Sequence, residues 1–189
     1  MGERHPTDQD DAALVARAQA GEVEAFGSLY ERYFDLVFRY LRSRVGDSQE
    51  AEDLSATVFL RAYQALRRYQ ERGWRFSAFL YGIARNALSD HFRHNRLEFP
   101  VEDLEGDAAA EGSPDQEFAS RESSERIREV LDALPPDYQE VIRLRVILGL
   151  PTPEVAHWMR RSDGAIRVLL HRALRAARKR MLENNETQS

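Results

Sequence analysis

Arginine side chains recur along one face of the last long helix that the sequence predicts. The stretch reads SDGAIRVLLHRALRAARKRM, and residues 160–181 contain eight basic residues against one acidic residue. At 100° per residue, Arg167, His171 and Arg175 share one face, while Ile166 lies on a face of small and aliphatic residues. Guanidinium groups bind DNA phosphates and the O6 and N7 atoms of guanine. The spacing therefore predicts a helix that binds DNA.

A solvated helix end is the alternative interpretation of this charge. Cations near a helix C-terminus complement the helix dipole, which would account for Arg178–Arg180 but not for Arg167 near the opposite end. The residues before the helix also favour DNA binding. A short helix expected from Thr152 to Met159, the turn RRSDG and a helix capped by Ser162 follow the order of a helix-turn-helix.

Apolar residues at a spacing of three and four predict that the rest of the chain is helical as well. They indicate amphipathic helices within residues 10–45, 46–69 and 76–97, and alternation typical of strands is not sustained anywhere. Asp47 or Ser48 is the expected N-cap of the second of these stretches, and Asp137 and Thr152 are expected to cap two later helices. The predicted fold class is all-α.

Charge divides the chain into three parts. Residues 1–97 carry no net charge, residues 98–123 carry a net charge of −8, and residues 124–189 carry a net charge of +3. The middle part combines its acids with Gly, Pro and Ser and has few apolar residues, as flexible linkers do. The sequence thus predicts two small helical domains joined by an acidic flexible linker.

The composition argues against several functions. Without cysteine the chain has no disulfide, thiolate nucleophile or cysteine-ligated zinc, and no secretory signal or membrane-spanning run is seen. A glycine-rich phosphate loop, a nucleophile elbow and a paired-carboxylate pattern are also missing. His91 and His94 have a spacing that could bind a metal, but an isolated pair is more typical of a solvated or DNA-facing surface. We expect neither an enzyme nor a metal or cofactor site.

The order of several motifs resembles the extracytoplasmic-function group of the sigma-70 family of bacterial RNA polymerase sigma factors. These motifs are LVARAQAGEVEAFGSLYERY, AEDLSATVFLRAY, FSAFLYGIARNALSDHFRHNR, an acidic linker, LDALPPDYQEVIRLR, GLPTPEVA and SDGAIRVLLHRALR. The resemblance covers roughly residues 10–182. It implies a sigma region-two domain at residues 10–97, a flexible linker at 98–123 and a region-four helix-turn-helix domain at 124–182.

The resemblance also implies which residues meet DNA and polymerase. Candidates for the promoter minus-ten element, where single-stranded bases are held, are Trp74, Arg75, Arg85, Asn86, Ser89, Arg93 and Arg96. Candidates for the minus-thirty-five element are Arg161, Ser162, Arg167, Val168, His171, Arg172 and Arg175. Glu52, Asp53 and Leu54 would contact the clamp helices of the beta-prime subunit, and an apolar surface involving Val146, Ile147 or Leu148 would contact the beta flap.

The implied function is an alternative sigma factor that binds core RNA polymerase and promoter DNA in the cytoplasm and is held by an anti-sigma factor. The sequence departs from the family pattern at Ala56, where Gln is frequent, and at Leu169 and Leu174, where basic residues are frequent. The other interpretation is a stand-alone helix-turn-helix regulator with a helical ligand-binding or dimerisation domain. The arginine and aromatic residues of 74–96 favour the sigma factor, because a ligand-binding domain has no need of them.

Overall fold

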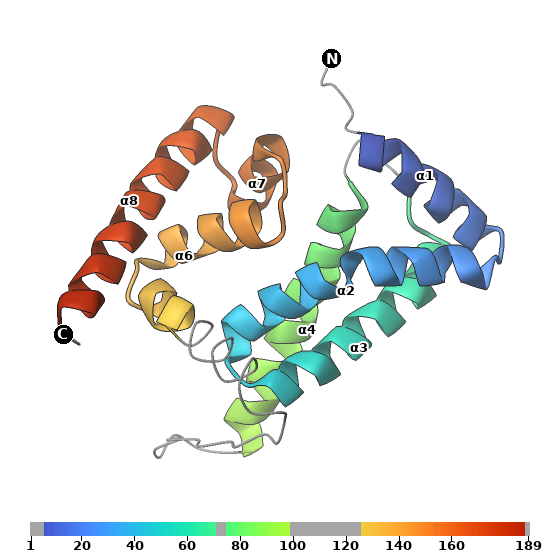
Figure 1. Cartoon of the computed structure of the whole chain (residues 1–189). Coiled ribbons are helices and arrows are strands. Elements are labelled where there is room, and N and C mark those ends of the chain that lie inside the picture. Colours follow the sequence, from blue (N-terminus) through green and yellow to red (C-terminus); the bar gives the residue numbers. More distant parts are fainter. Residues whose placement is uncertain (1–5, 71–74, 99–125, 188–189) are drawn as a thin grey trace. The chain divides into compact units, whose positions relative to one another are not determined.

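The structure consists of two helical units. The computed structural model describes residues 6–70, 75–98 and 126–187, with side chains over 10–70, 75–94 and 126–183. One unit lies within residues 1–104 and the other within 105–189 (Figure 1). No strand occurs in these described ranges, so the all-α prediction is confirmed. The predicted linker, residues 98–123, lies almost wholly outside them.

Four helices form the first unit. They are α1 (Pro6–Gln19), α2 (Val23–Val45), α3 (Ser48–Leu66) and α4 (Phe76–Glu98). α2 packs against α1 and α3, and α3 packs against α4. Fully buried side chains from α2, α3 and α4, including Leu29, Val58 and Leu80, meet in the core. Removing such side chains from water is the main driving force for this packing.

The junction of α2 and α3 follows from two adjacent residues. Gly46 has a φ of 86°, a left-handed conformation that suits glycine, and its N–H donates to Arg42 O at 2.9 Å. Asp47 is the N-cap of α3, because its Oδ1 accepts a hydrogen bond from the Glu50 N–H at 2.8 Å. Of the two caps expected from the sequence, Asp47 is therefore the one used.

Two polar side chains fasten α1 to the rest of the first unit. Asp11 is only 4% exposed and accepts hydrogen bonds from Arg32 and from the hydroxyl of Tyr33, both on α2. Gln19 Nε2 donates to Leu66 O at 2.9 Å and to Tyr69 O at 2.7 Å, at the C-terminal end of α3. The Leu66 carbonyl also accepts from the Tyr69 N–H at 3.0 Å, so Gln19 joins a turn that already closes the end of α3. α1 is thus tied to both of its neighbours.

The second unit is built around a helix-turn-helix. Residues 126–132 are helical, followed by α6 (Pro136–Ile142), the π-helical turn η1 (Arg143–Ile147), α7 (Thr152–Met159) and α8 (Asp163–Thr187). α8 packs against α6 and α7. The core of the second unit includes the fully buried Leu144, Leu150 and Val155 together with Ile166 of α8. Both elements of the predicted helix-turn-helix are therefore present.

Two expected N-caps are wrong. Pro135 is the N-cap of α6 and Asp137 lies inside its first turn, while Pro151 is the N-cap of α7 and Thr152 already belongs to the helix. Proline has a fixed φ that suits the start of a helix and lacks the N–H that would be unpaired there. Backbone restriction, rather than side-chain capping, therefore sets these two starts.

Candidate nucleic-acid interface

The turn between α7 and α8 fixes the geometry of the helix-turn-helix. Arg160 ends α7 in a left-handed conformation with a φ of 53°, and Arg161 N donates to Ala156 O at 2.9 Å. Ser162 then caps α8, because its Oγ accepts from the Ala165 N–H at 3.2 Å. This confirms Ser162 as the cap and gives its hydroxyl a structural role besides the predicted DNA contact.

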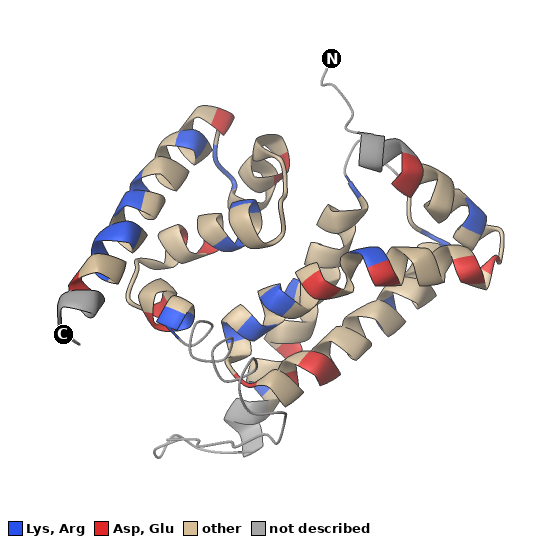
Figure 2. Cartoon of the chain, viewed as in Figure 1, with Lys and Arg blue, Asp and Glu red and all other residues tan. Residues whose placement is uncertain are grey.

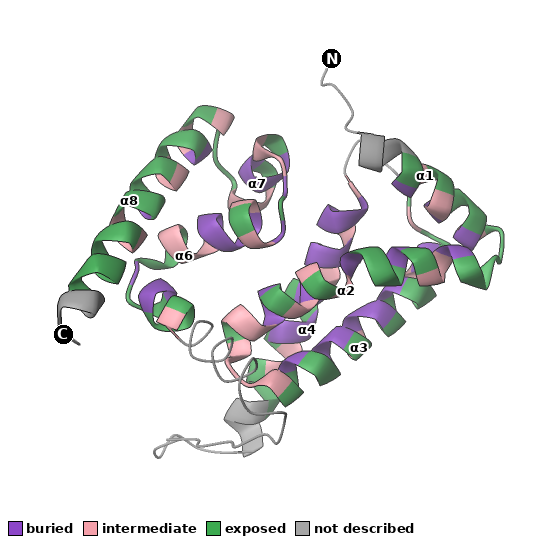
Figure 3. Cartoon of the chain, viewed as in Figure 1, coloured by how far each residue is buried: buried purple, intermediate pink, exposed green. Residues whose placement is uncertain are grey.

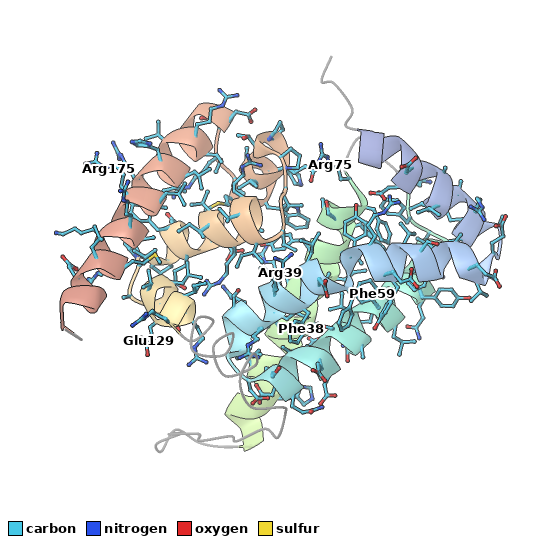
Figure 4. The ribbon with its side chains drawn as sticks, viewed as in Figure 1. Phe38, Arg39, Phe59, Arg75, Glu129 and Arg175 are labelled. Carbon is cyan, nitrogen blue, oxygen red and sulfur yellow. The ribbon has the colours of Figure 1, made fainter. Side chains whose placement is uncertain are left out.

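The predicted reading residues lie on the exposed face of α8. Ile166 and Ala173 of the same helix are fully buried. At 100° per residue, the opposite side is an arc of about 140°, and its members Arg167, Val168, His171, Arg172 and Arg175 are all exposed. Figure 2 shows the basic residues recurring along α8, Figure 3 shows how much of it is exposed, and Figure 4 labels Arg175. The helix presents a surface that is mainly basic, with the exposed Val168 among the arginines.

Arg161, the candidate in the turn before α8, has an acidic partner within the same unit. Its Nη2 forms an ion pair with the Asp137 carboxylate in the first turn of α6, and both side chains are exposed. The pair joins the turn to α6. Part of the charge of Arg161 is therefore used within the unit, a contact that the sequence did not predict.

In the first unit, α4 exposes a polar face that contains four of the minus-ten candidates. Ala84, Ala87 and Leu88 are buried. The candidates between and after them, Arg85, Asn86, Ser89 and Arg93, are all exposed. Phe92 belongs to the apolar three-and-four pattern of residues 76–97, which predicts a core position, but it is 41% exposed. Its position beside Arg93 adds an aromatic ring to the exposed face.

The remaining minus-ten candidates are placed differently. Arg75 lies just before α4 and is half-buried, with Phe76 and Phe79 following it on the helix. Arg96 belongs to α4, but its side chain is outside the described residues, as is all of Trp74. Their predicted roles remain predictions.

Aromatic rings pack at both ends of the segment that contains Trp74. Tyr69, after α3, lies 4.6 Å from Phe79 and 6.1 Å from Phe76 between ring centroids, and Tyr33 of α2 lies 5.6 Å from Phe76. The backbone carbonyl of Tyr69 is also the acceptor for Gln19. This cluster fixes the end of α3 relative to the start of α4.

An ion-pair network on the exposed side of α3 and α4 was not predicted from the sequence. Asp90 Oδ2 accepts from Arg61 Nη1 of α3 at 2.9 Å, and Asp90 Oδ1 accepts from Arg93 Nη2 at 2.7 Å. The Arg61 hydrogen bond, assisted by the charges of both arginines, lowers the pKa of the Asp90 carboxyl below its ordinary value. The sequence shows only the i,i+3 spacing of Asp90 and Arg93, because the contact with Arg61 depends on how α3 and α4 pack.

The three residues predicted to contact the polymerase clamp divide into two groups. Glu52 and Asp53 are exposed near the N-terminal end of α3, where acids are favoured by the helix dipole. Leu54 is only 9% exposed and packs in the core. Leu60 and Tyr63, further along α3, are exposed. The acidic part of the prediction is therefore placed on the surface, and Leu54 is not.

The expected beta-flap residues lie in the π-helical turn η1 or directly after it. Val146 is exposed, Ile147 is half-buried and Leu148, just after η1, is buried. A π-turn opens where Leu148 N donates to Arg143 O at 3.0 Å, five residues back. Of the three, Val146 is the side chain most available for contact.

The His91 and His94 pair does not converge on a common ligand site. His91 Nε2 lies 3.6 Å from Glu50 Oε2, whereas His94 Nδ1 lies 3.0 Å from the backbone oxygen of Asp90. Within the residues whose positions are described, no three metal-binding side chains gather. None of the helices described is long and apolar enough to cross a membrane.

A helix-turn-helix whose second helix exposes an arginine-rich face is typical of DNA-binding proteins. The model of sigma-70 region 2 matches residues 29–98, and that of sigma-70 region 4 matches residues 124–176. The ECF RNA polymerase sigma factor BldN of Streptomyces coelicolor is 39% identical over 178 residues, which are 91% of this chain and 67% of BldN. The ECF sigma factor SigD of Mycobacterium tuberculosis is 38% identical over 168 residues, 86% of this chain and 79% of SigD.

The fold of the chain is also similar to solved structures. The structure of CnrH in complex with the cytosolic domain of CnrY has a TM-score of 0.69 and 25% identity, covering 93% of this chain and 98% of that chain. The sigma factor RpoE from Bartonella quintana, solved with the anti-sigma factor NepR, has the same fold, with a TM-score of 0.60 and 20% identity, over 84% of this chain and 96% of that one.

The chain therefore belongs to the sigma-70 family, in its group of ECF RNA polymerase sigma factors. It is an alternative sigma factor that directs transcription. The resemblance noted in the sequence is thereby confirmed and is favoured over the stand-alone regulator.

Proposed function

We propose that the two units divide promoter recognition between them, with residues 10–97 acting on the minus-ten element and residues 124–182 on the minus-thirty-five element. The observation that carries the proposal is the pair of exposed polar and cationic faces, one on α4 and one on α8. Arg85, Asn86, Ser89 and Arg93 supply hydrogen-bond donors and positive charge for a single strand. Arg167, His171 and Arg175 supply them for duplex DNA.

Core polymerase binding is assigned to two other surfaces. Glu52 and Asp53 of α3 would meet the clamp helices of the beta-prime subunit, and the exposed Leu60 and Tyr63 extend that surface along the helix. Val146 of η1 would meet the beta flap. In this scheme the phosphodiester chemistry belongs to the polymerase, the sigma factor performs no catalysis of its own, and both act in the cytoplasm.

An anti-sigma factor is the proposed regulator. The similar protein CnrH was solved bound to the cytosolic domain of CnrY, which supports a protein partner for this fold. Such a partner would cover the polymerase-binding surface on α3 and would be displaced when initiation is required.

The division of roles is tested with two arginine variants in holoenzyme reconstituted with bacterial core polymerase. Arg167→Ala is expected to weaken complex formation on duplex promoters by about tenfold, because one bidentate arginine contact is worth roughly 1–3 kcal/mol. Arg85→Ala is expected to leave duplex binding nearly unchanged and to reduce strand opening, measured by permanganate reactivity of unpaired thymines.

Lys179→Ala is the matched control for α8. Lys179 lies on the same helix, beyond the residues matched by the region-four model, and its Nζ is 3.6 Å from Glu183 Oε1. If Lys179→Ala weakens binding as much as Arg167→Ala does, only net charge matters and the reading role of α8 is refuted. If Arg85→Ala opens DNA normally, the role of α4 is refuted.

A further inference from the structure

A carboxylate lies between two guanidinium groups on the exposed surface of the first unit. Each oxygen of Asp90 accepts a hydrogen bond from a different arginine: Oδ2 from Arg61 at 2.9 Å and Oδ1 from Arg93 at 2.7 Å. The arginines come from α3 and α4, so the arrangement bridges two helices. The side chains are 43% exposed for Arg61, 37% for Asp90 and 64% for Arg93. All three are therefore open to an incoming ligand.

The geometry of this trio resembles the way proteins hold a phosphate group. Two guanidinium groups that donate to two oxygens of one anion make charge-assisted hydrogen bonds. The geometry of a guanidinium group suits the oxygens of a carboxylate and those of a phosphate alike. Exposed ion pairs contribute little to stability, because water and salt screen them. Another anion can thus displace the Asp90 carboxylate at small cost, whereas a deeply buried carboxylate would be held too firmly to exchange.

The position of the trio fits a nucleic-acid strand as that other anion. Ser89 and Asn86, one and four residues before Asp90 on the same helix, are exposed, and so is Arg85, which directly precedes Asn86. On the other side, His94 Nδ1 lies 3.0 Å from the backbone oxygen of Asp90. The trio therefore lies within the face of α4 already proposed to hold the promoter strand.

We propose that Asp90 is an internal substitute for a DNA phosphate: it occupies Arg61 and Arg93 in the free protein, and a backbone phosphate of the promoter strand takes its place in the complex. This inference rests on the proposed function of α4. It adds Arg61, a residue of α3, to the strand-binding residues. It also makes Asp90 a restraint on binding to unrelated DNA, because the carboxylate offsets one of the two positive charges and occupies a donor of each arginine until a strand is positioned well enough to exchange with it.

The inference is tested on holoenzyme with a fork-junction DNA, duplex upstream and single-stranded on the non-template strand, with core polymerase alone as background. Asp90→Asn removes the competing charge without changing the size of the side chain. The Asp90→Asn holoenzyme is expected to bind the fork about twofold to fivefold more tightly than wild type at low salt, a small change because the ion pairs are exposed. The slope of log K against log salt is expected to steepen by about 0.7, the value for one further cation on a single strand.

Arg61→Gln supplies the second arm of the experiment. In the wild-type background, Arg61→Gln removes a phosphate contact, but it also removes the Arg61–Asp90 hydrogen bond that the phosphate has to displace. The net effect on DNA affinity is therefore small. In the Asp90→Asn background only the contact is lost, so Arg61→Gln is expected to weaken binding more than it does alone. A residue that merely held Arg61 and Arg93 in place would give the opposite sign of coupling.

Asp35→Asn is the matched control, because it removes one exposed carboxylate from α2 and changes the net charge equally. Asp90→Glu keeps the charge and is expected to stay close to wild type. Thermal unfolding of each variant reports separately on any loss of the tie between α3 and α4.

Two results would overturn the inference while leaving the proposed function intact. Asp90→Asn could bind no more tightly than Asp35→Asn, which would reduce the effect to net charge, or it could bind more weakly than wild type, which would make Asp90 a simple support. Wild-type holoenzyme that binds the fork no better than core polymerase would instead overturn the proposed function, and the inference with it.

Discussion

Individual side chains near the DNA-binding faces have structural duties as well as proposed contacts. Ser162 caps α8 through its hydroxyl, Arg161 is paired with Asp137, and Arg93 is paired with Asp90. Substituting such a residue changes two properties at once. The experiments at this scale therefore separate the stability of a unit from its binding.

Ser162→Ala is expected to lower the free energy of unfolding of the second unit by about 1 kcal/mol, because the Ala165 N–H loses its acceptor. Ser162→Thr keeps an oxygen acceptor and should cost much less. Urea unfolding followed by the fluorescence of Trp158, in a Trp74→Phe background, measures this unit alone, since these are the two tryptophans of the chain. Equal stability of Ser162→Ala and wild type would show that the cap contributes nothing.

Asp53 and Leu54 are adjacent but should respond in opposite ways. Asp53 is exposed, so Asp53→Arg should leave the first unit folded and weaken core polymerase binding by about tenfold or more through like-charge contact with a basic clamp. Leu54 is buried, so Leu54→Ala should lower the unfolding free energy by about 2–4 kcal/mol. Core binding by competition and unfolding by circular dichroism distinguish them. Glu31→Arg, an exposed reversal on α2, is the control, and equal loss of binding there would contradict the assignment of α3.

Helices of this chain are positioned by a few polar ties in addition to apolar packing. α1 is held by Asp11, which contacts Arg32 and Tyr33, and by Gln19, which reaches the end of α3. Because Gln19 also binds the Tyr69 carbonyl, α1 supports the residues that precede the segment containing Trp74. An element outside the residues matched by the region-two model thereby helps to place the end of α3.

The neighbouring residues Asp10 and Asp11 provide a matched test of that tie. Asp11→Ala removes the carboxylate that accepts a hydrogen bond from the Tyr33 hydroxyl, and it should destabilise the first unit by about 1–3 kcal/mol. Asp10 is exposed, and Asp10→Ala should change the stability by less than about 0.5 kcal/mol. Thermal unfolding followed by circular dichroism compares them. Similar midpoints for both variants would mean that α1 is not held by Asp11.

Helix order and the exposed face of α8 could be predicted from the sequence, because three-and-four periodicity records which side of a helix is buried. The pattern also placed Ser162 and Asp47 as caps. It failed where position depends on packing between helices or on backbone restriction. Leu54, expected at the polymerase clamp, is buried, and Phe92, whose spacing places it on the apolar face of α4, is exposed. The prolines replaced Asp137 and Thr152 as caps, and the contact between Arg61 and Asp90 spans two helices that the periodicity treats separately.

In the whole molecule, a strongly acidic segment separates the two units in the sequence. Residues 98–123, with their net charge of −8, lie between the two proposed DNA-binding units. We propose that this polyanionic segment occupies space in the polymerase that nucleic acid takes later. Its charge would then matter only while RNA is short.

Deletion of residues 102–117 tests the role of the acidic segment. The expected result is a changed ratio of abortive to full-length RNA, because the segment no longer competes with the growing transcript, while core binding through α3 is kept. Gel analysis of short RNA products measures the ratio. Replacement of these residues by a neutral Gly-Ser segment of equal length is the control for tether length. An unchanged ratio in both variants would refute the proposal.

Run-off transcription shows whether this chain makes core RNA polymerase selective for promoters. Core polymerase is supplied with a library of promoter-like duplexes, with and without the full chain, and the transcribed templates are sequenced. Initiation is expected only when the chain is present, on templates that share two spaced elements, and Arg167→Ala should relax selection at the upstream element alone. If the chain binds duplex DNA through Arg167 but neither binds core polymerase nor supports initiation, its role as a sigma factor is refuted.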